Sequence, residues 1–117
     1  MVLDYGEATV ADVYSDAEVV TLFSKTSNVP GKHKTGGQSA ARMERCRDNE
    51  IKLWFKELNS YLLSLDRDEV VLGISDHYYN RFKKTLHTYS LEKISKQVST
   101  GYSNLSGIYE VINILSN

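Results

Sequence analysis

A helical repeat of apolar side chains between residues 39 and 65 constrains the fold more than any other feature of the sequence. The repeat recurs every three or four residues through Met43, Arg47, Ile51, Trp54, Leu58, Leu62 and Leu65, of which only Arg47 is charged, and Cys46, Phe55 and Tyr61 widen it. This spacing predicts an amphipathic α-helix of about 26 residues, roughly 39 Å long. The residues from Ser39 to Asp48 are mostly small or charged, and apolar residues become frequent on this helix face only from Ile51 onward. We therefore expect the first part of the helix to project from the domain and the second part to pack on a sheet.

Three short strands are predicted before this helix, at residues 2–5, 8–14 and 19–23. These segments are rich in β-branched and aromatic residues, and turn residues separate them. They are most simply an antiparallel meander. Pro30 fixes its own φ and disfavours helical angles in the residue before it, so we expect it to end the third strand and begin a loop.

The second half of the chain alternates strand and helix patterns. Residues 70–74 are uniformly apolar, which predicts a central strand covered on both faces, and residues 76–86 follow as a helix. Residues 93–99 alternate as a strand suited to a sheet edge, and the closing helix at residues 104–115 is expected to place one apolar face on the sheet. Its members are Leu105, Ile108, Ile112 and Leu115. The pattern predicts a single α/β domain with a mixed sheet flanked by helices.

Length and composition exclude several classes of protein. A chain of 117 residues, 41% hydrophobic and 25% charged, is typical of one soluble globular domain, and no apolar run is long enough to span a membrane. The single cysteine, Cys46, excludes an internal disulfide framework, and the first residues lack the pattern of a secretory signal. We therefore expect a cytoplasmic monomer. Because a strand pattern begins at the second residue, we also expect a domain cut from a longer protein.

The loop before the long helix carries the clearest functional signal. Gly36 and Gly37 are adjacent residues without a Cβ, so the backbone there can adopt unusual angles and approach a ligand closely. The segment 25–47 contains six lysines and arginines and one acid, a net charge of +5, whereas the whole chain carries −1. A cationic loop on an otherwise acidic body indicates contact with a phosphate backbone.

The residues of this loop resemble those of a known family. Lys32-His33, followed by Gly36-Gly37-Gln38-Ser39 and Arg42, is similar to the middle domain of the archaeal and eukaryotic class-one peptide chain release factors. The likeness continues through residues 70–74, 100–102 and 107–110, so it covers nearly the whole chain. It implies an RNase H-like arrangement for residues 1–117, with the long helix carrying the Gly-Gly-Gln loop at its N-terminus. The codon-reading domain and the domain that recruits the translational GTPase would lie outside this chain.

The resemblance implies that the loop enters the ribosomal peptidyl transferase centre and triggers hydrolysis of the peptidyl-tRNA ester in translation termination. Gly36, Gly37 and Gln38 would be the catalytic residues, acting only on the ribosome and not as a stand-alone enzyme. The backbone amide of Gln38 suits an oxyanion donor. The neutral carboxamide of its side chain cannot act as a general base at pH 7. In the family this glutamine is also the target of an N5-methylating methyltransferase.

The remaining predicted site residues would contact ribosomal or transfer RNA: Lys32, His33, Lys34, Ser39, Arg42, Arg45 and Arg47. For Arg45 and Arg47 a solvated helix face is an equally good interpretation. No set of His, Cys, Asp and Glu has zinc-like spacing and no nucleotide-binding fingerprint occurs, so we expect no metal and no cofactor. Two other functions stay open, a ribosome-rescue peptidyl-tRNA hydrolase and a non-catalytic module that docks on RNA.

Overall fold

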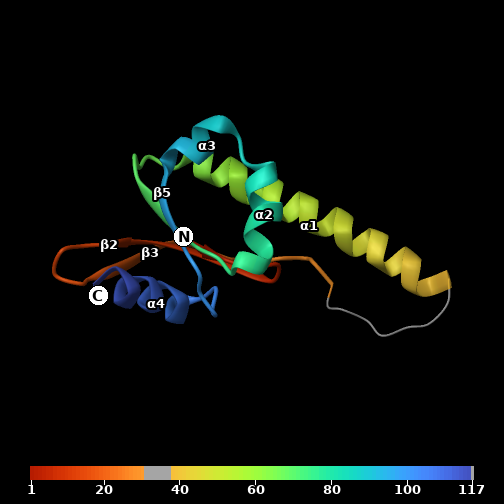
Figure 1. Cartoon of the computed structure of the whole chain (residues 1–117), viewed down its shortest axis with the longest axis horizontal. Helices are drawn as coiled ribbons and strands as arrows, with labels where there is room; N and C mark the ends of the chain where they lie inside the picture. Colours follow the sequence, from red (N-terminus) through yellow and green to blue (C-terminus); the bar gives the residue numbers. More distant parts are fainter. Residues whose placement is uncertain (31–37, 117) are drawn as a thin grey trace.

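In the computed structural model, which describes residues 1–30 and 38–116, helices cover both faces of a five-stranded sheet (Figure 1). The strands are β1 (Val2–Leu3), β2 (Glu7–Val13), β3 (Val19–Thr26), β4 (Val70–Gly73) and β5 (Ile94–Val98). The helices are α1 (Gln38–Ser64), α2 (Asp76–Thr85), α3 (Thr88–Lys93) and α4 (Leu105–Ser116). Figure 1 shows α1, α2 and α3 on one side of the sheet and α4 on the other.

The strand order in the sheet is β3-β2-β1-β4-β5. The first three strands pair antiparallel, and β4 is parallel to both β1 and β5. Parallel neighbours need a crossover connection, which α1 and the α2–α3 pair supply here. The predicted α/β class, with an antiparallel meander followed by α/β units, is therefore confirmed, and it is consistent with the RNase H-like arrangement. As predicted, β4 lies inside the sheet and β5 lies at an edge.

The second half of α1 builds the main core. Trp54 is almost completely buried, and Ile51, Phe55, Leu58 and Leu62 are fully buried. They pack with apolar residues of the sheet and of α2, among them Leu3, Ala8, Val10, Leu72, Ile74 and Phe82. By contrast Arg42, Glu44, Arg45 and Cys46 are exposed. The helix therefore begins away from the body, at the end where its ribbon is yellow to orange (Figure 1). The predicted division of this helix is confirmed, but Cys46 does not belong to the packed stripe.

Local hydrogen bonds explain where the strands differ from the prediction. β1 is only two residues long, because the Asp4 carboxylate turns the chain by accepting from the amides of Gly6 at 2.7 Å and Glu7 at 2.9 Å. β3 continues to Thr26, three residues beyond the predicted end, because its pairing with β2 runs on to the pair of Glu7 and Thr26. β2 is therefore paired with β3 along its whole length and with β1 through two residues.

Two features of the second half were not predicted correctly. The short helix α3 was missed; it forms because His87 caps it, its Nδ1 accepting from the amide of Tyr89 at 3.2 Å. In α4 the predicted packing face is only partly right, because Ile108 is buried whereas Leu105 is 45% exposed and Leu115 is 44% exposed. The helix thus touches the sheet through its middle, and its apolar ends face outward.

Candidate functional site

The predicted site residues that the structure describes lie in the first turns of α1. Gln38 is the first residue of this helix and Ser39 is the second. The predicted catalytic residues Gly36 and Gly37 lie outside the described residues. So do the predicted RNA contacts Lys32, His33 and Lys34. The first four amide groups of any α-helix lack an intrahelical acceptor, and the helix dipole places partial positive charge there. The backbone at Gln38 can therefore donate hydrogen bonds to an oxygen atom that approaches the helix end.

Two of the predicted RNA contacts lie on the projecting part of α1. The side chains of Arg42 and Arg45 are exposed and stand three residues apart, which places them on neighbouring positions of one helix surface. Neither arginine forms an ion pair with another residue that the structure describes. Their charges are available to a polyanion that approaches the start of the helix.

Arg47 differs from these two arginines because the fold itself uses its guanidinium. Its side chain is half-buried, and its Nε donates a hydrogen bond to the carbonyl oxygen of Pro30 at 3.2 Å. The guanidinium carbon also lies 5.3 Å from the centre of the Tyr5 ring, within the range of a cation–π contact. Arg47 therefore connects α1 to the segment that leads into the loop, a contact that sequence analysis did not anticipate.

Tyr5 is the centre of the packing at the base of the projecting segment. Its ring centre lies 4.3 Å from that of Tyr78 and 5.6 Å from that of Phe55. Arg81 approaches the same ring at 5.9 Å and pairs with Asp48 at 3.3 Å. These contacts join the turn after β1, α1 and α2. The sequence offered no signal for this cluster, because Tyr5 follows a strand like any other aromatic residue.

The chain that leaves β3 is also held by the body of the domain. The Ser27 hydroxyl donates to the carbonyl oxygen of Tyr5 at 2.6 Å and accepts from the amide of Val29 at 3.2 Å. The Ser27 amide donates to the carbonyl oxygen of Gly6 at 2.7 Å. With Arg47 on Pro30, both chain segments that flank residues 31–37 are fixed to the same scaffold. A defined stem of this kind reduces the entropy that a loop loses when it is positioned on a partner.

Lys25 contributes less to the positive charge of this region than the sequence suggested. Its ammonium forms an ion pair with Glu57, on the packed part of α1. Both side chains are largely exposed, so the pair contributes about 0–1 kcal/mol to stability. The unpaired cations of the described segment are therefore concentrated at the start of α1 and not along β3.

Neither a metal site nor a membrane segment is evident in the part of the chain that the structure describes. No group of three His, Cys, Asp or Glu side chains there could hold a metal ion. His77 and His87 lie at the starts of two different helices, where their rings contact Tyr78 and Tyr89. None of the described helices is both long enough and apolar enough to cross a membrane.

Comparison with known proteins identifies the family. The model of the family described as eRF1 domain 2 matches residues 1–117. The chain belongs to this family. The peptide chain release factor subunit 1 of Methanobrevibacter smithii is 38% identical over 119 residues, and that of Archaeoglobus fulgidus is 33% identical over 123 residues. Each alignment covers 96% of this chain but only 29% of the relative. This eRF1 domain 2 chain thus spans less than a third of the release factors that it matches, and the resemblance found in the sequence is confirmed.

Proposed function

We propose that this domain acts in translation termination, in the cytoplasm, by bringing the Gly36-Gly37-Gln38 motif to the peptidyl-tRNA ester on the ribosome. The observation that carries the proposal is the mounting of the motif: Gln38 opens a 27-residue helix whose first turns project and whose later turns are buried. Membership of the eRF1 domain 2 family supports the same role. On its own the domain is expected to be inactive, because the ribosome supplies the substrate and most of the site.

The chemistry asks for a positioned donor and for controlled access of water. Water attacks the ester carbonyl, negative charge develops on the carbonyl oxygen, and the ribose oxygen leaves. The backbone N–H of Gln38, in the first turn of α1, is the donor that we assign to this oxygen. One preorganised donor of this kind contributes about 3 kcal/mol to the stability of the transition state, a hundredfold or more in rate.

The other groups of the motif have supporting roles in this proposal. Gly36 and Gly37 allow the backbone to approach the ester without the obstruction of a Cβ. The Gln38 side chain fills the space beside the ester and restricts the nucleophile to water, since a carboxamide does not take up a proton at pH 7. Its amide nitrogen is also the proposed target of an N5-methylating methyltransferase.

The cationic residues position the domain on RNA. Arg42 and Arg45 are exposed near the helix start, as phosphate contacts require. We assign the same role to Lys32, His33, Lys34 and Ser39 on sequence grounds. Arg47 would contact RNA while its Nε also keeps the hydrogen bond to the carbonyl oxygen of Pro30. Contacts of this kind supply affinity and salt dependence but read no base sequence.

Grafting tests the proposal directly. This chain replaces the middle domain of the Methanobrevibacter smithii factor, and peptide release is measured on ribosomes stopped at a stop codon. The intact graft is expected to release peptide, and Gly37→Ala is expected to abolish release with ribosome binding unchanged, because the change alters backbone freedom and no charge. Release that survives Gly37→Ala would contradict the role assigned to the glycines.

The same graft tests the docking alternative, because binding without any release would support a docking module. A rescue hydrolase would differ from a termination factor in the domains outside this chain, so the sequence that flanks these 117 residues separates the two. Lys32→Ala with Lys34→Ala is expected to weaken binding and to lower its salt slope by about one unit per lost phosphate contact. The matched control is Lys84→Ala with Lys96→Ala, two exposed lysines on α2 and β5 that the proposal leaves off the RNA. Equal slopes for the two double variants would refute the assignment of the loop lysines.

A further inference from the structure

Arg47 lies on a different side of α1 from the other two arginines in the projecting turns of that helix. Successive residues of an α-helix turn by about 100°, so Arg47 lies about 200° around the helix from Arg45 and about 140° from Arg42. Arg42 and Arg45 are exposed, whereas Arg47 is half-buried. The first two arginines therefore face a partner outside the domain, and Arg47 faces the domain's own chain.

The guanidinium of Arg47 makes two contacts with that chain. Its Nε donates to the carbonyl oxygen of Pro30 at 3.2 Å, and its central carbon lies 5.3 Å from the centre of the Tyr5 ring. Pro30 is the last residue that the structure describes before the Gly-Gly-Gln loop. A planar guanidinium can lie over an aromatic ring while its edge donates a hydrogen bond. Both contacts thus use the shape of the guanidinium as well as its charge.

These contacts complete a ring of interactions around the stem of the loop. The Tyr5 carbonyl accepts from the Ser27 hydroxyl at 2.6 Å, and that hydroxyl accepts from the Val29 amide at 3.2 Å. Tyr5 therefore contacts the side of the stem that leaves β3 through its backbone, and the side formed by α1 through its ring. Among the described residues of this ring, Arg47 and Pro30 join the two sides directly.

The core of the domain holds Tyr5 in place. The centre of its ring lies 4.3 Å from that of Tyr78 and 5.6 Å from that of Phe55, and Phe55 is fully buried. The position of the Arg47 guanidinium, and with it the position of the Pro30 carbonyl, is therefore determined by packed residues of α1 and α2.

The hydrogen bond to Pro30 gives the chain a direction at the point where the loop begins. Arg47 lies about 14 Å along α1 from Gln38, and residues 31–37 connect Pro30 to Gln38. Without this hydrogen bond the free segment would begin about three residues earlier, and the entropy of closing the longer loop would change the rate by less than about twofold. A misplacement of the reacting groups by about 1 Å costs about a hundredfold. The direction of the chain therefore matters more than the length of the free segment.

We propose that Arg47 is a positioning residue for peptide release, which fixes through Pro30 the direction in which the chain enters the Gly-Gly-Gln loop. This inference rests on the proposed function and adds to it a role that charge alone does not supply. A residue that only bound RNA would act through its charge. A residue that only stabilised the fold would change unfolding and not the rate of release by the folded domain.

Two substitutions separate the hydrogen bond from the charge. Arg47→Gln loses the charge but keeps an N–H donor on the atom that follows Cδ, where arginine has Nε. Arg47→Lys keeps the charge, but its donors lie one bond further along the side chain. Each variant is placed in the graft, and the rate of release is measured in a single turnover at saturating factor. The Kd for the ribosome, its salt dependence and urea unfolding of each variant are measured alongside.

The matched control is Arg67→Lys. The guanidinium of Arg67 is also held by a distant part of the fold, the Asp12 carboxylate at 2.6 Å, but Arg67 follows the opposite end of α1 from Gln38. We expect this substitution to leave the rate of release unchanged. A loss as large as that of Arg47→Lys would overturn the proposal, because any exchange of a held arginine for lysine would then slow release.

With Arg47→Lys we expect release about tenfold slower at saturation, with ribosome binding and its salt slope unchanged. With Arg47→Gln we expect release within about threefold of the unchanged graft and a salt slope lower by up to about one unit. The reverse order would overturn the proposal, since charge would then be what Arg47 supplies. Equal rates for the two variants would also overturn it, because an N–H at the Nε position would then have no separate effect.

A second measurement needs no ribosome. In the free domain the Nε–H of Arg47 is expected to exchange with water at least about tenfold more slowly than those of the exposed Arg42 and Arg45. Equal exchange at the three arginines would overturn the proposal, because the hydrogen bond to Pro30 would then not persist in solution. An unchanged graft that releases no peptide would contradict the proposed function. Slow exchange at Arg47 together with full release by Arg47→Lys would contradict the positioning role alone.

Discussion

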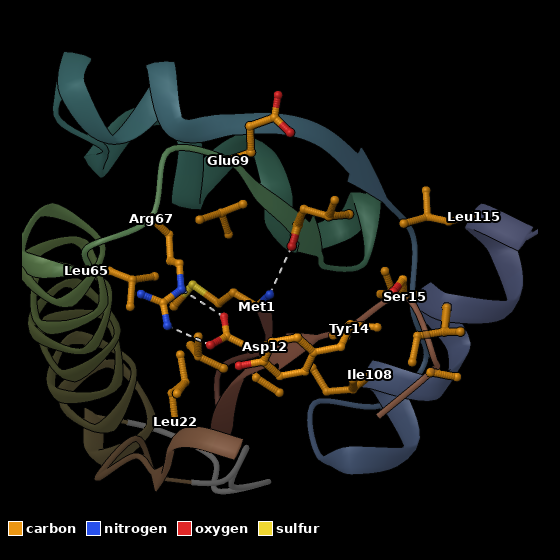
Figure 2. A pocket seen from close by; sticks show the side chains of 18 of the residues that line it. Met1, Asp12, Tyr14, Ser15, Leu22, Leu65, Arg67, Glu69, Ile108 and Leu115 are labelled. Atoms are coloured by element: carbon orange, nitrogen blue, oxygen red, sulfur yellow. Dashed lines mark hydrogen bonds and ion pairs between the residues drawn. The ribbon is translucent and has the colours of Figure 1, made fainter. Parts of the chain in front are cut away.

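The free α-amine of Met1 makes the stability of the 117-residue chain depend on pH. This amine is buried at the centre of the pocket in Figure 2, where it donates to the carbonyl of Val71 at 2.9 Å. Burial lowers the pKa of the amine from 8.0 to about 6, because the charged form loses its hydration. Below pH 8 the unfolded chain therefore binds a proton that the folded chain does not yet bind.

The sign and size of the effect follow from the two pKa values. Between pH 8 and pH 6 the unfolded state carries more protons, so the free energy of unfolding falls as the pH falls. The full loss is about 3 kcal/mol, reached below pH 6, since each pKa unit corresponds to about 1.4 kcal/mol. A loss of this size is a large fraction of the about 5–15 kcal/mol that stabilises a typical domain.

Urea unfolding at pH 5, 6, 7, 8 and 9 measures the effect, with the N-acetylated chain as the control. Acetylation removes the titrating amine and leaves the histidines and carboxylates unchanged, so the difference between the two chains isolates Met1. We expect the acetylated chain to be more stable by about 3 kcal/mol at pH 5 than the free chain, relative to their difference at pH 9. Parallel stability curves for the two chains would refute the inference that the amine is buried.

Two predictions concern packing. Gly107→Ala should destabilise the domain by about 3 kcal/mol in urea unfolding. The reason is that a Cβ at Gly107 would lie 2.0 Å from the carbonyl oxygen of Tyr102, whereas at Gly101, the control, its nearest neighbours are 3.9 Å away; similar losses in both variants would contradict this contact. Leu58→Ala, in the buried half of α1, should cost about 2–5 kcal/mol. In the control Leu53→Ala, at an exposed position, the free energy of unfolding should change by no more than about 0.5 kcal/mol. Equal losses of stability in the Leu58 and Leu53 variants would show that the buried face of α1 is wrongly assigned.

The sequence alone was sufficient to predict the parts of the fold that rest on local patterns. The long helix was expected to end at Leu65 and ends at Ser64, because the spacing of its apolar residues repeats with the helical period. The uniformly apolar run at residues 70–74 correctly predicted an interior strand. The Gly-Gly-Gln motif and its charged neighbours likewise identified the family without any structure.

Only the tertiary structure decided which distant groups meet. Arg47 lies 17 residues from Pro30, and Arg67 lies 55 residues from Asp12, yet each pair forms a hydrogen bond. Nothing in the local sequence distinguishes these arginines from Arg42 or Arg45, which stay exposed. Periodicity and turn chemistry act over a few residues, so they determine the elements, whereas the choice of partners depends on how the whole chain buries its apolar surface.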